Sequence, residues 1–380
     1  LSGRVTDADG KPLAEAVVFV VNPDTRRWSD ATTSRNGTWT IRSLPAGTYR
    51  VQYLAPYGVN AVGQWWKGAT TIDAAATVTV ADGKTVRGLD ARLARGGTIR
   101  GVVTGPGGAP VADAEIAVSR GGEIIAWAQT NAGGSYVVTG LEDATYTLRV
   151  RPALGSDLAE RWWKAKAPGA KPTTLKIAKA NEIRDIDVAL VPGAKITGTL
   201  RAASGTPLAG AYVEAYRQGD GDGERVAEAS TDTAGSYTLP GLAAGTYAVK
   251  FTYEDGTDSR VVWWGRKPTA ETARTITVTK AVAMPGHNAT LPRGLDSGTL
   301  VLSGAPRVGS TLTAATASWP KGTHFLYRWW VGGDRVNTAT GRTLKLTAAH
   351  RGSSVTLEVV AWGTGTSAVE RMVWMDEPIR

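Results

Sequence analysis

The sequence predicts an all-β protein, organised as a tandem array of four β-sandwich domains. Three observations lead to this fold class: a module-length repeat, valine- and threonine-rich runs that alternate at period two, and regularly spaced turn residues. The chain holds 46 glycines and 18 prolines in 380 residues, which is typical of a turn-rich globular protein. This length suffices for three or four domains.

A turn ending in Thr-Tyr, followed sixteen residues after the tyrosine by a Trp-Trp pair, occurs three times. Tyr49, Tyr146 and Tyr247 are 97 and 101 positions apart, and the Trp pairs move by the same steps. A unit of this length can bury its own core, so we expect domains in series and not a solenoid. Because the connections between modules are short, we expect a stiff, extended row about 150 Å long. The expected modules are residues 1–95, 96–192, 193–292 and 293–380.

The elements of the first module follow one another in an order that the next two modules repeat. A strand at 3–6 ends at the turn Asp9–Pro12, where glycine accepts a positive φ and proline cannot donate to a ladder. The apolar run 16–21 predicts a buried strand. Asn36–Gly37 is a strong hairpin signal, and the module closes with a strand at 87–93.

This order of elements resembles the carboxypeptidase regulatory-like and collagen-adhesin B-type repeats in three copies, over residues 1 to 292. The signature residues are Asp7–Ala16, with the pattern D-x-D-G-x-P-L-A-x-A, and Leu44–Tyr49, with the pattern L-P-A-G-T-Y. The resemblance implies transthyretin-like (prealbumin-like) sandwiches from secreted or surface proteins of high-GC Gram-positive bacteria. Some collagen-adhesin domains join a lysine to an asparagine or aspartate covalently, and the resemblance makes Lys195 and Asn288 the candidate pair here.

The fourth module departs from the repeat and resembles the immunoglobulin-like repeats of bacterial surface proteins. Its Tyr327–Trp330 segment carries the Y-x-W pattern of that family. Strand alternation then places Tyr327 and Trp329 in the core and Trp330 on the outer face.

Charge and composition exclude several classes of function. The net charge of +9 is spread thinly over all four modules without a basic run, so we expect no nucleic-acid partner. We expect no membrane span, because no stretch approaches the roughly 18 apolar residues required. The absence of cysteine excludes disulfides and thiolate metal sites.

Catalytic and metal-binding constellations are missing from the sequence. His287, His324 and His350 are scattered and match no triad or H-E-x-x-H spacing, so we expect no catalytic residue, no cofactor and no enzyme activity. The acidic run Asp220–Glu224 has alternate carboxylates but lacks the rest of a calcium loop. It is interpreted as a hairpin tip, and no metal is expected.

The Trp pairs are the candidate ligand-binding residues. Neighbouring side chains of an extended segment point to opposite faces, so one indole of each pair must meet solvent, another module or a ligand. Exposed indoles suit sugar rings, whereas the alternative role is to fill the core or seal the module junctions. The candidates are Trp65, Trp66, Trp162, Trp163, Trp263 and Trp264.

The sequence therefore favours a non-catalytic extracellular surface or matrix protein that acts as an adhesive stalk, spacer or assembly module. Its expected partner is a cell-wall or extracellular polysaccharide, or a protein. One alternative is a carbohydrate-binding accessory region of a secreted hydrolase. The other is a self-assembling filament subunit that associates through exposed strand edges.

Overall fold

The computed structural model describes residues 1–24, 27–164, 172–218, 223–255, 258–375 and 377–380. The described residues form β-strands and four short 3-10 helices, with no α-helix among them. The strands build two-layer sandwiches, which confirms the predicted fold class.

The first module has two facing sheets, ordered β4-β1-β8 and β3-β2-β5-β6, with β7 also paired to β5. The alternating apolar residues of β2 and β5 point into the core between the sheets. The elements are β1 Ser2–Thr6, β2 Val17–Val21, β3 Trp28–Thr32, β4 Thr38–Thr40, β5 Gly47–Leu54, β6 Gln64–Trp65, η1 Trp66–Gly68, β7 Val78–Val80 and β8 Ala91–Arg92.

The second module repeats this plan with sheets β12-β9-β16 and β11-β10-β13-β14, to which β17 and β15 add through β9 and β13. Its elements are β9 Gly97–Thr104, η2 Pro106–Gly108, β10 Glu115–Arg120, β11 Glu123–Gln129, β12 Ser135–Leu141, β13 Thr145–Arg151, β14 Arg161–Trp162, β15 Thr174–Lys176, β16 Glu182–Ile183 and β17 Val188–Ala189.

In the third module, the sheet β21-β18-β25, with β26 also on β18, faces the strands β20-β19-β22-β23, with β24 on β22. Its elements are β18 Ala194–Ala202, β19 Tyr212–Arg217, β20 Glu224–Ser230, β21 Ser236–Leu242, β22 Gly245–Asp255, β23 Asp258–Trp263, η3 Ala270–Thr272, β24 Thr275–Val278, β25 Ala283–Met284 and β26 Ala289–Leu291.

The fourth module packs the sheet β27-β28-β31 against the strands β33-β32-β29-β30. Trp329 is fully buried in its core and Tyr327 packs against that core, as the Y-x-W pattern predicted. The elements are β27 Thr299–Ser303, β28 Thr311–Ala317, β29 His324–Val331, β30 Asp334–Arg335, β31 Thr343–Lys345, η4 Ala348–His350, β32 Val355–Trp362 and β33 Ala368–Met375.

The tyrosine of the repeated Thr-Tyr turn pins that turn to the core. The hydroxyls of Tyr49, Tyr146 and Tyr247 donate to carbonyl oxygens four residues earlier, at 2.7, 2.8 and 2.6 Å. The three rings lie in three separate cores. The repeated motif is therefore structural: a buried hydroxyl is satisfied locally and closes the turn.

A second buried hydroxyl ties the strand that follows the glycine turn to the end of each repeat. The strands on the two sides of that turn pair in opposite sheets, so the expected hairpin is wrong. Tyr136 donates to the carbonyl oxygen of Ile186 at 2.6 Å, and Tyr237 makes the same contact in the third module. In the first module Trp39 occupies the equivalent register, and its buried indole N–H makes no hydrogen bond with any described residue. Tyr53, from the facing sheet, donates to the corresponding carbonyl oxygen at 2.9 Å instead. All three repeats therefore have a tyrosine hydroxyl bonded to this carbonyl oxygen, but in the first module the tyrosine comes from a different strand.

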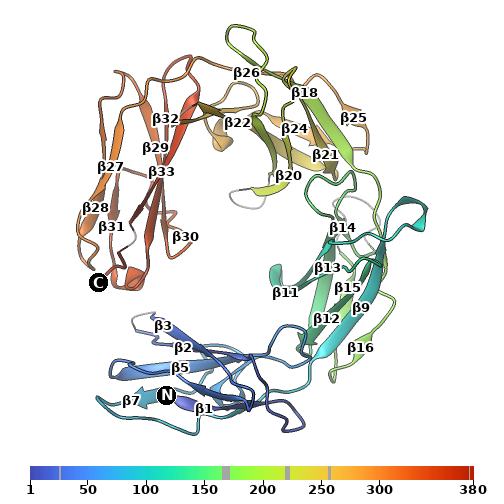
Figure 1. Cartoon of the computed structure of the whole chain (residues 1–380), viewed down its shortest axis with the longest axis vertical. Helices are drawn as coiled ribbons and strands as arrows, with labels where there is room; N and C mark the ends of the chain where they lie inside the picture. The colour runs from blue at the N-terminus through green and yellow to red at the C-terminus, as the bar shows by residue number, and fades with distance from the viewer. Residues whose placement is uncertain (25–26, 165–171, 219–222, 256–257, 376) are drawn as a thin grey trace.

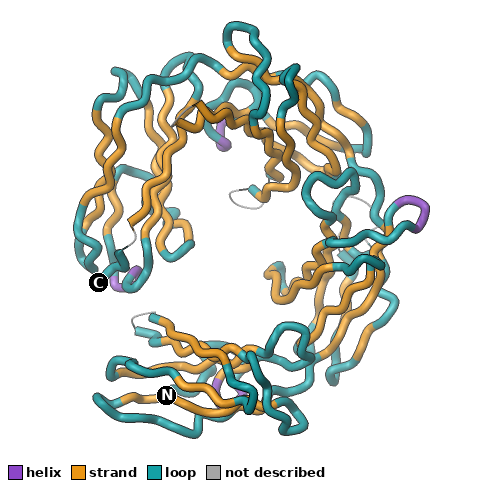
Figure 2. Tube along the Cα trace, in the orientation of Figure 1, coloured by secondary structure: helices purple, strands orange, loops and turns teal. Residues whose placement is uncertain are grey.

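The four modules curve into an open ring, so the expected extended row is wrong (Figures 1 and 2). The first and fourth modules approach each other, and a Cβ at Gly352 would lie 3.3 Å from Cγ of Arg27. Each connection is only a few residues long, but the modules it joins also contact each other directly. These contacts bend the array in one direction at each junction. The length of a connection does not reveal the direction of bending, so the sequence could not predict the ring.

Candidate ligand-binding groove

The Trp pairs lie beside the central strand of one sheet in each repeat. The first indole of each pair sits opposite an outer-face residue, as the pairings Gln52–Trp65, Arg149–Trp162 and Lys250–Trp263 show. The second indole packs against the core of its own module. These second indoles are Trp66, Trp163 and Trp264.

Only some of these indoles reach solvent. Trp65, Trp163 and Trp263 are buried, whereas Trp66, Trp162 and Trp264 are half-buried. Trp263 packs in a cluster with Val360 and Ala368 of the fourth module, so it seals a module junction. A ligand-binding role for the pairs remains a prediction.

The third and fourth modules share one continuous nine-stranded sheet. β23 pairs antiparallel with β33, with Ser259 opposite Glu370 and Val261 opposite Ala368. The outer face of this joined sheet is hollowed into a groove of about 560 Å³. Its lining residues come from both modules: Tyr216, Lys250, Thr252, Ser259, Trp263, Ala270, Arg328, Trp330, Arg335, Glu358, Glu370, Met372 and Trp374.

The sheet register arranges this lining in rows. Trp330, Thr356 and Trp374 are aligned across β29, β32 and β33, and the next row holds Arg328, Glu358 and Met372. Because residues two apart on a strand share a face, the aromatic row and the charged row lie side by side. The groove therefore alternates flat apolar surface with hydrogen-bonding groups.

Four charged residues of the groove, Lys250, Glu370, Arg328 and Glu358, form two ion pairs. Nζ of Lys250 lies 2.7 Å from Oε2 of Glu370, across the module junction. Nη1 of Arg328 lies 2.8 Å from Oε1 of Glu358, and Nη2 lies 3.0 Å from Oε1 of Glu271. Burial raises the pKa of Glu358, which Arg328 partly offsets, and the pKa of Arg328 is itself raised by its acidic neighbours against the effect of burial.

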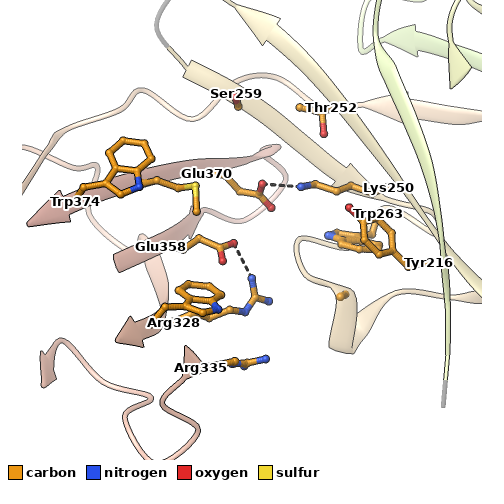
Figure 3. Close-up of a pocket in the computed structure, with 13 residues that line it drawn as sticks. Tyr216, Lys250, Thr252, Ser259, Trp263, Arg328, Arg335, Glu358, Glu370 and Trp374 are labelled. Atoms are coloured by element: carbon orange, nitrogen blue, oxygen red, sulfur yellow. Dashed lines mark hydrogen bonds and ion pairs between the residues drawn. The ribbon is translucent and has the colours of Figure 1, made fainter. Parts of the chain in front are cut away.

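Aromatic side chains stand at both ends of the groove, with the ion pairs between them (Figure 3). Trp374 lies at one end with 61% of its surface exposed. Tyr216 and Trp263 lie at the other end, with ring centroids 5.4 Å apart. Half-buried Trp330 accompanies Trp374 in the lining, on the outer face where alternation predicted it.

The histidines have structural surroundings. Nδ1 of His287 lies 2.9 Å from the carbonyl oxygen of Met284, and its ring packs on Trp264. His324 stacks on Trp362, and His350 accepts a bond from the backbone of Thr347.

Glu142 and Asp143, which precede the second Thr-Tyr turn, are likewise engaged. Glu142 pairs with Arg120 at 2.7 Å. Asp143 accepts two backbone N–H groups, which lower its pKa. No group of three or more metal-ligating side chains occurs in the described part of the chain. Within that part, no helix is long and apolar enough to cross a membrane.

The candidate covalent pair of the third module is not brought together. Nζ of Lys195 lies 2.8 Å from Oδ1 of Asp157 in the second module. Oδ1 of Asn288 accepts the backbone N–H of Thr199 at 2.9 Å. Asp90 and Asp187 accept the equivalent first-strand N–H groups at 2.8 Å in the other two repeats. In each repeat, the Asp or Asn side chain near the last strand therefore accepts a hydrogen bond from a backbone N–H of the first strand.

The acidic run Asp220–Glu224 is only partly visible. Asp220 and Asp222 lie outside the described residues, so the hairpin-tip interpretation remains a prediction. Glu224 is described, and its carboxylate pairs with Arg149 and Arg151 of the second module.

Sequence reasoning missed most of the groove. Lys250, Arg328, Glu358 and Glu370 carry no motif, and Trp374 stands apart from the Trp pairs. The available signal was the period-two run Glu370, Met372 and Trp374, which places a polar and two large apolar side chains on one face of β33. The partner strand β23 could not be inferred, because more than a hundred residues separate the two strands.

The family model of the carboxypeptidase regulatory-like domain matches residues 1–94, 98–191 and 195–290. The chain belongs to this family, which confirms the resemblance of its first three modules. No curated protein matches the chain in sequence.

Several solved multidomain structures are similar to parts of the chain. The Bacillus anthracis TIE protein is 16% identical with a TM-score of 0.23, and the alignment covers 76% of this chain and 50% of that one. The chain thus spans about half the length of that protein. A streptococcal ancillary pilin is 11% identical with a TM-score of 0.26, covering 76% and 98%. The major pilin subunit BcpA of Bacillus cereus is 12% identical with a TM-score of 0.18, covering 75% and 97%.

Proposed function

We propose that this chain is a non-catalytic extracellular protein of the cell surface or matrix, which holds four sandwiches in a fixed curve to present adhesive surface. Its partner is a wall or matrix polysaccharide or a surface protein. The junction of the third and fourth modules supports a scaffold role, since a backbone ladder over an apolar cluster fixes how the two modules are oriented. His287, His350 and Glu142 are engaged in structural contacts, which supports the non-catalytic part of the proposal.

The observation that carries the adhesive role is the exposed aromatic surface bordering the central opening. Trp28 on β3 is 64% exposed and Trp127 on β11 is 60% exposed, and both strands face the opening (Figure 1). Trp127 also contacts Tyr57 of the first module, with centroids 5.8 Å apart. Exposed aromatic groups of this size are more common in interaction sites than on inert surfaces.

The test is retention of the labelled full chain on intact bacterial cells and on isolated cell walls. We expect Trp28→Ala and Trp127→Ala to weaken retention, whereas the control Leu154→Ala, an exposed apolar residue of a loop, does not. A parallel screen with polysaccharide, ester and peptide substrates measures turnover. Retention by neither cells nor walls would reject the adhesive role, and turnover would reject the non-catalytic one.

Self-assembly is a second candidate, favoured by β11. This strand forms an edge of its sheet, and Ile124 is 51% exposed on it. An apolar edge strand can accept a strand from another chain. Sedimentation velocity over a range of concentrations would then show growing species that Ile124→Lys abolishes. A single species at every concentration contradicts this candidate.

A further inference from the structure

We propose that the groove on the joined sheet of the third and fourth modules binds a neutral oligosaccharide chain. This inference deepens the proposed adhesive function, because it names the ligand class of one surface. It concerns a surface other than the one that carries Trp28 and Trp127.

The groove has the size and construction of a binding site. Its volume of about 560 Å³ lies within the roughly 300–1,000 Å³ typical of small-molecule sites. Its floor is rigid, because β23 and β33 are hydrogen-bonded across the module junction. The site exists only when the two modules are joined.

Trp374 at one end provides the exposed stacking surface, and half-buried Tyr216 lines the other end, where Trp263 is buried. Trp374 on β33 is largely exposed although Thr356 of the adjacent strand β32 lies in register with it. Met372, two residues earlier on the same face, is also exposed. Large exposed apolar groups rimmed by polar residues mark an interaction site. The C–H face of a pyranose ring is flat and apolar, and its size matches an indole, so it can cover such a group without losing its hydroxyl contacts.

The charged groups between these ends provide hydrogen bonds without net charge. Lys250 is balanced by Glu370 and Arg328 by Glu358. Arg335 of the lining adds a third cation, and Glu271, which bonds Arg328, adds a third carboxylate. A sugar hydroxyl both donates and accepts, so it can bond a carboxylate oxygen and an ammonium or guanidinium N–H at once. A polyanion or polycation would have to compete with the pairs, and breaking a partly buried pair leaves one charge uncompensated. This charge balance favours a neutral ligand.

The geometry also argues against a peptide strand as the occupant. Both β23 and β33 are paired on two sides, with β22 and β33 and with β23 and β32. Where these strands meet, at residues 259–261 and 368–370, the groove therefore exposes the face of a sheet and no free edge, so strand addition has no backbone partners there.

Isothermal titration calorimetry with the full chain tests the proposal. The neutral probes are cellohexaose, maltohexaose, mannohexaose and galactohexaose, and the charged probes are polygalacturonate and chitosan oligosaccharide. We expect at least one neutral probe to bind and the charged probes not to compete with it. Trp374→Ala should weaken that binding at least about tenfold, as truncation of an aromatic anchor does. The matched control Val301→Ala, an exposed apolar residue on the other sheet of the fourth module, should leave it unchanged.

Glu370→Gln keeps the shape of the side chain but removes the charge that pairs with Lys250. We expect a lower melting temperature, because Lys250 is left uncompensated, and weaker binding when affinity is measured well below that temperature on the folded variant. Failure of every neutral probe, preference for a charged probe, or full affinity in Trp374→Ala each overturns the proposal. Wall retention that depends on Trp28 and Trp127 would survive such a failure, so the two proposals are distinguishable.

Discussion

Ion pairs occur at the junction of the second and third modules and at that of the third and fourth, but among the described residues only the latter also has a backbone ladder between two strands. At the first of these junctions, Glu160 and Glu224 contact Arg149 and Arg151 of the second module, and Glu160 also contacts Arg217 of the third. At the second, β23 and β33 form one ladder over a small apolar cluster. Salt screens charged contacts, but it barely affects a ladder.

This contrast teaches where a groove can form. Ion pairs can hold two sandwiches at an angle without merging their sheets. A shared ladder instead aligns the outer faces of two modules, so that residues from both line one surface. The candidate oligosaccharide site lies at the junction with the shared ladder.

The largest effect is expected from Val261→Asp. Val261 is fully buried opposite Ala368, so an aspartate there would bury an unpaired charge and destabilise the joined sheet by at least about 3 kcal/mol. Thermal denaturation and limited proteolysis of the connection at residues 292–298 measure this. The control Val282→Asp changes a valine that is 55% exposed in the same module. Equal melting of the two variants would show that the ladder does not hold the junction.

A smaller effect is expected from Gly241→Ala at the junction of the second and third modules. Gly241 has φ +70°, and a Cβ there would lie 2.3 Å from the carbonyl oxygen of Ser156. Gly210→Ala is the matched control, since its φ is +73° but nothing lies within 4 Å. An alanine at a positive φ strains the backbone in both variants. Only Gly241→Ala adds a steric clash, which should lower its free energy of unfolding by about 1–3 kcal/mol more than in the control. Denaturant titration measures the difference, and equal stabilities would contradict tight contact at this junction.

The smallest effect is expected from Glu160→Gln, which keeps the side-chain shape but removes one charge from the ion network. We expect the free energy of unfolding to fall by about 1.5 kcal/mol, which is typical of losing a hydrogen bond to a charged group. Fluorescence energy transfer between labels on the second and third modules should show a looser junction, and about 1 M salt should loosen the parent in the same direction. Glu182→Gln, in a surface ion pair, is the control. An unchanged distance in Glu160→Gln would show that the network does not set the angle.

The fold was predictable where the signal is local. The Thr-Tyr turns and the period-two strands concern residues close in sequence, and the structure places them as expected. The turn at Asn36–Gly37 is also present, but the expected hairpin is wrong, because the flanking strands β3 and β4 pair in opposite sheets. The candidate site was predictable only at Trp263 and in the outward orientation of Trp330. Its ion pairs join residues such as Lys250 and Glu370, which no motif connects.

By itself the sequence determined the four sandwiches and their cores, because side-chain periodicity and turn chemistry act within a module. Only the tertiary structure decided how the array curves, which contacts hold each junction and where the groove lies. These depend on which strand edges and charged groups of separately folded modules meet. The contact between β23 and β33 is one example. These two strands are more than a hundred residues apart in the chain, so no local sequence pattern could predict their pairing.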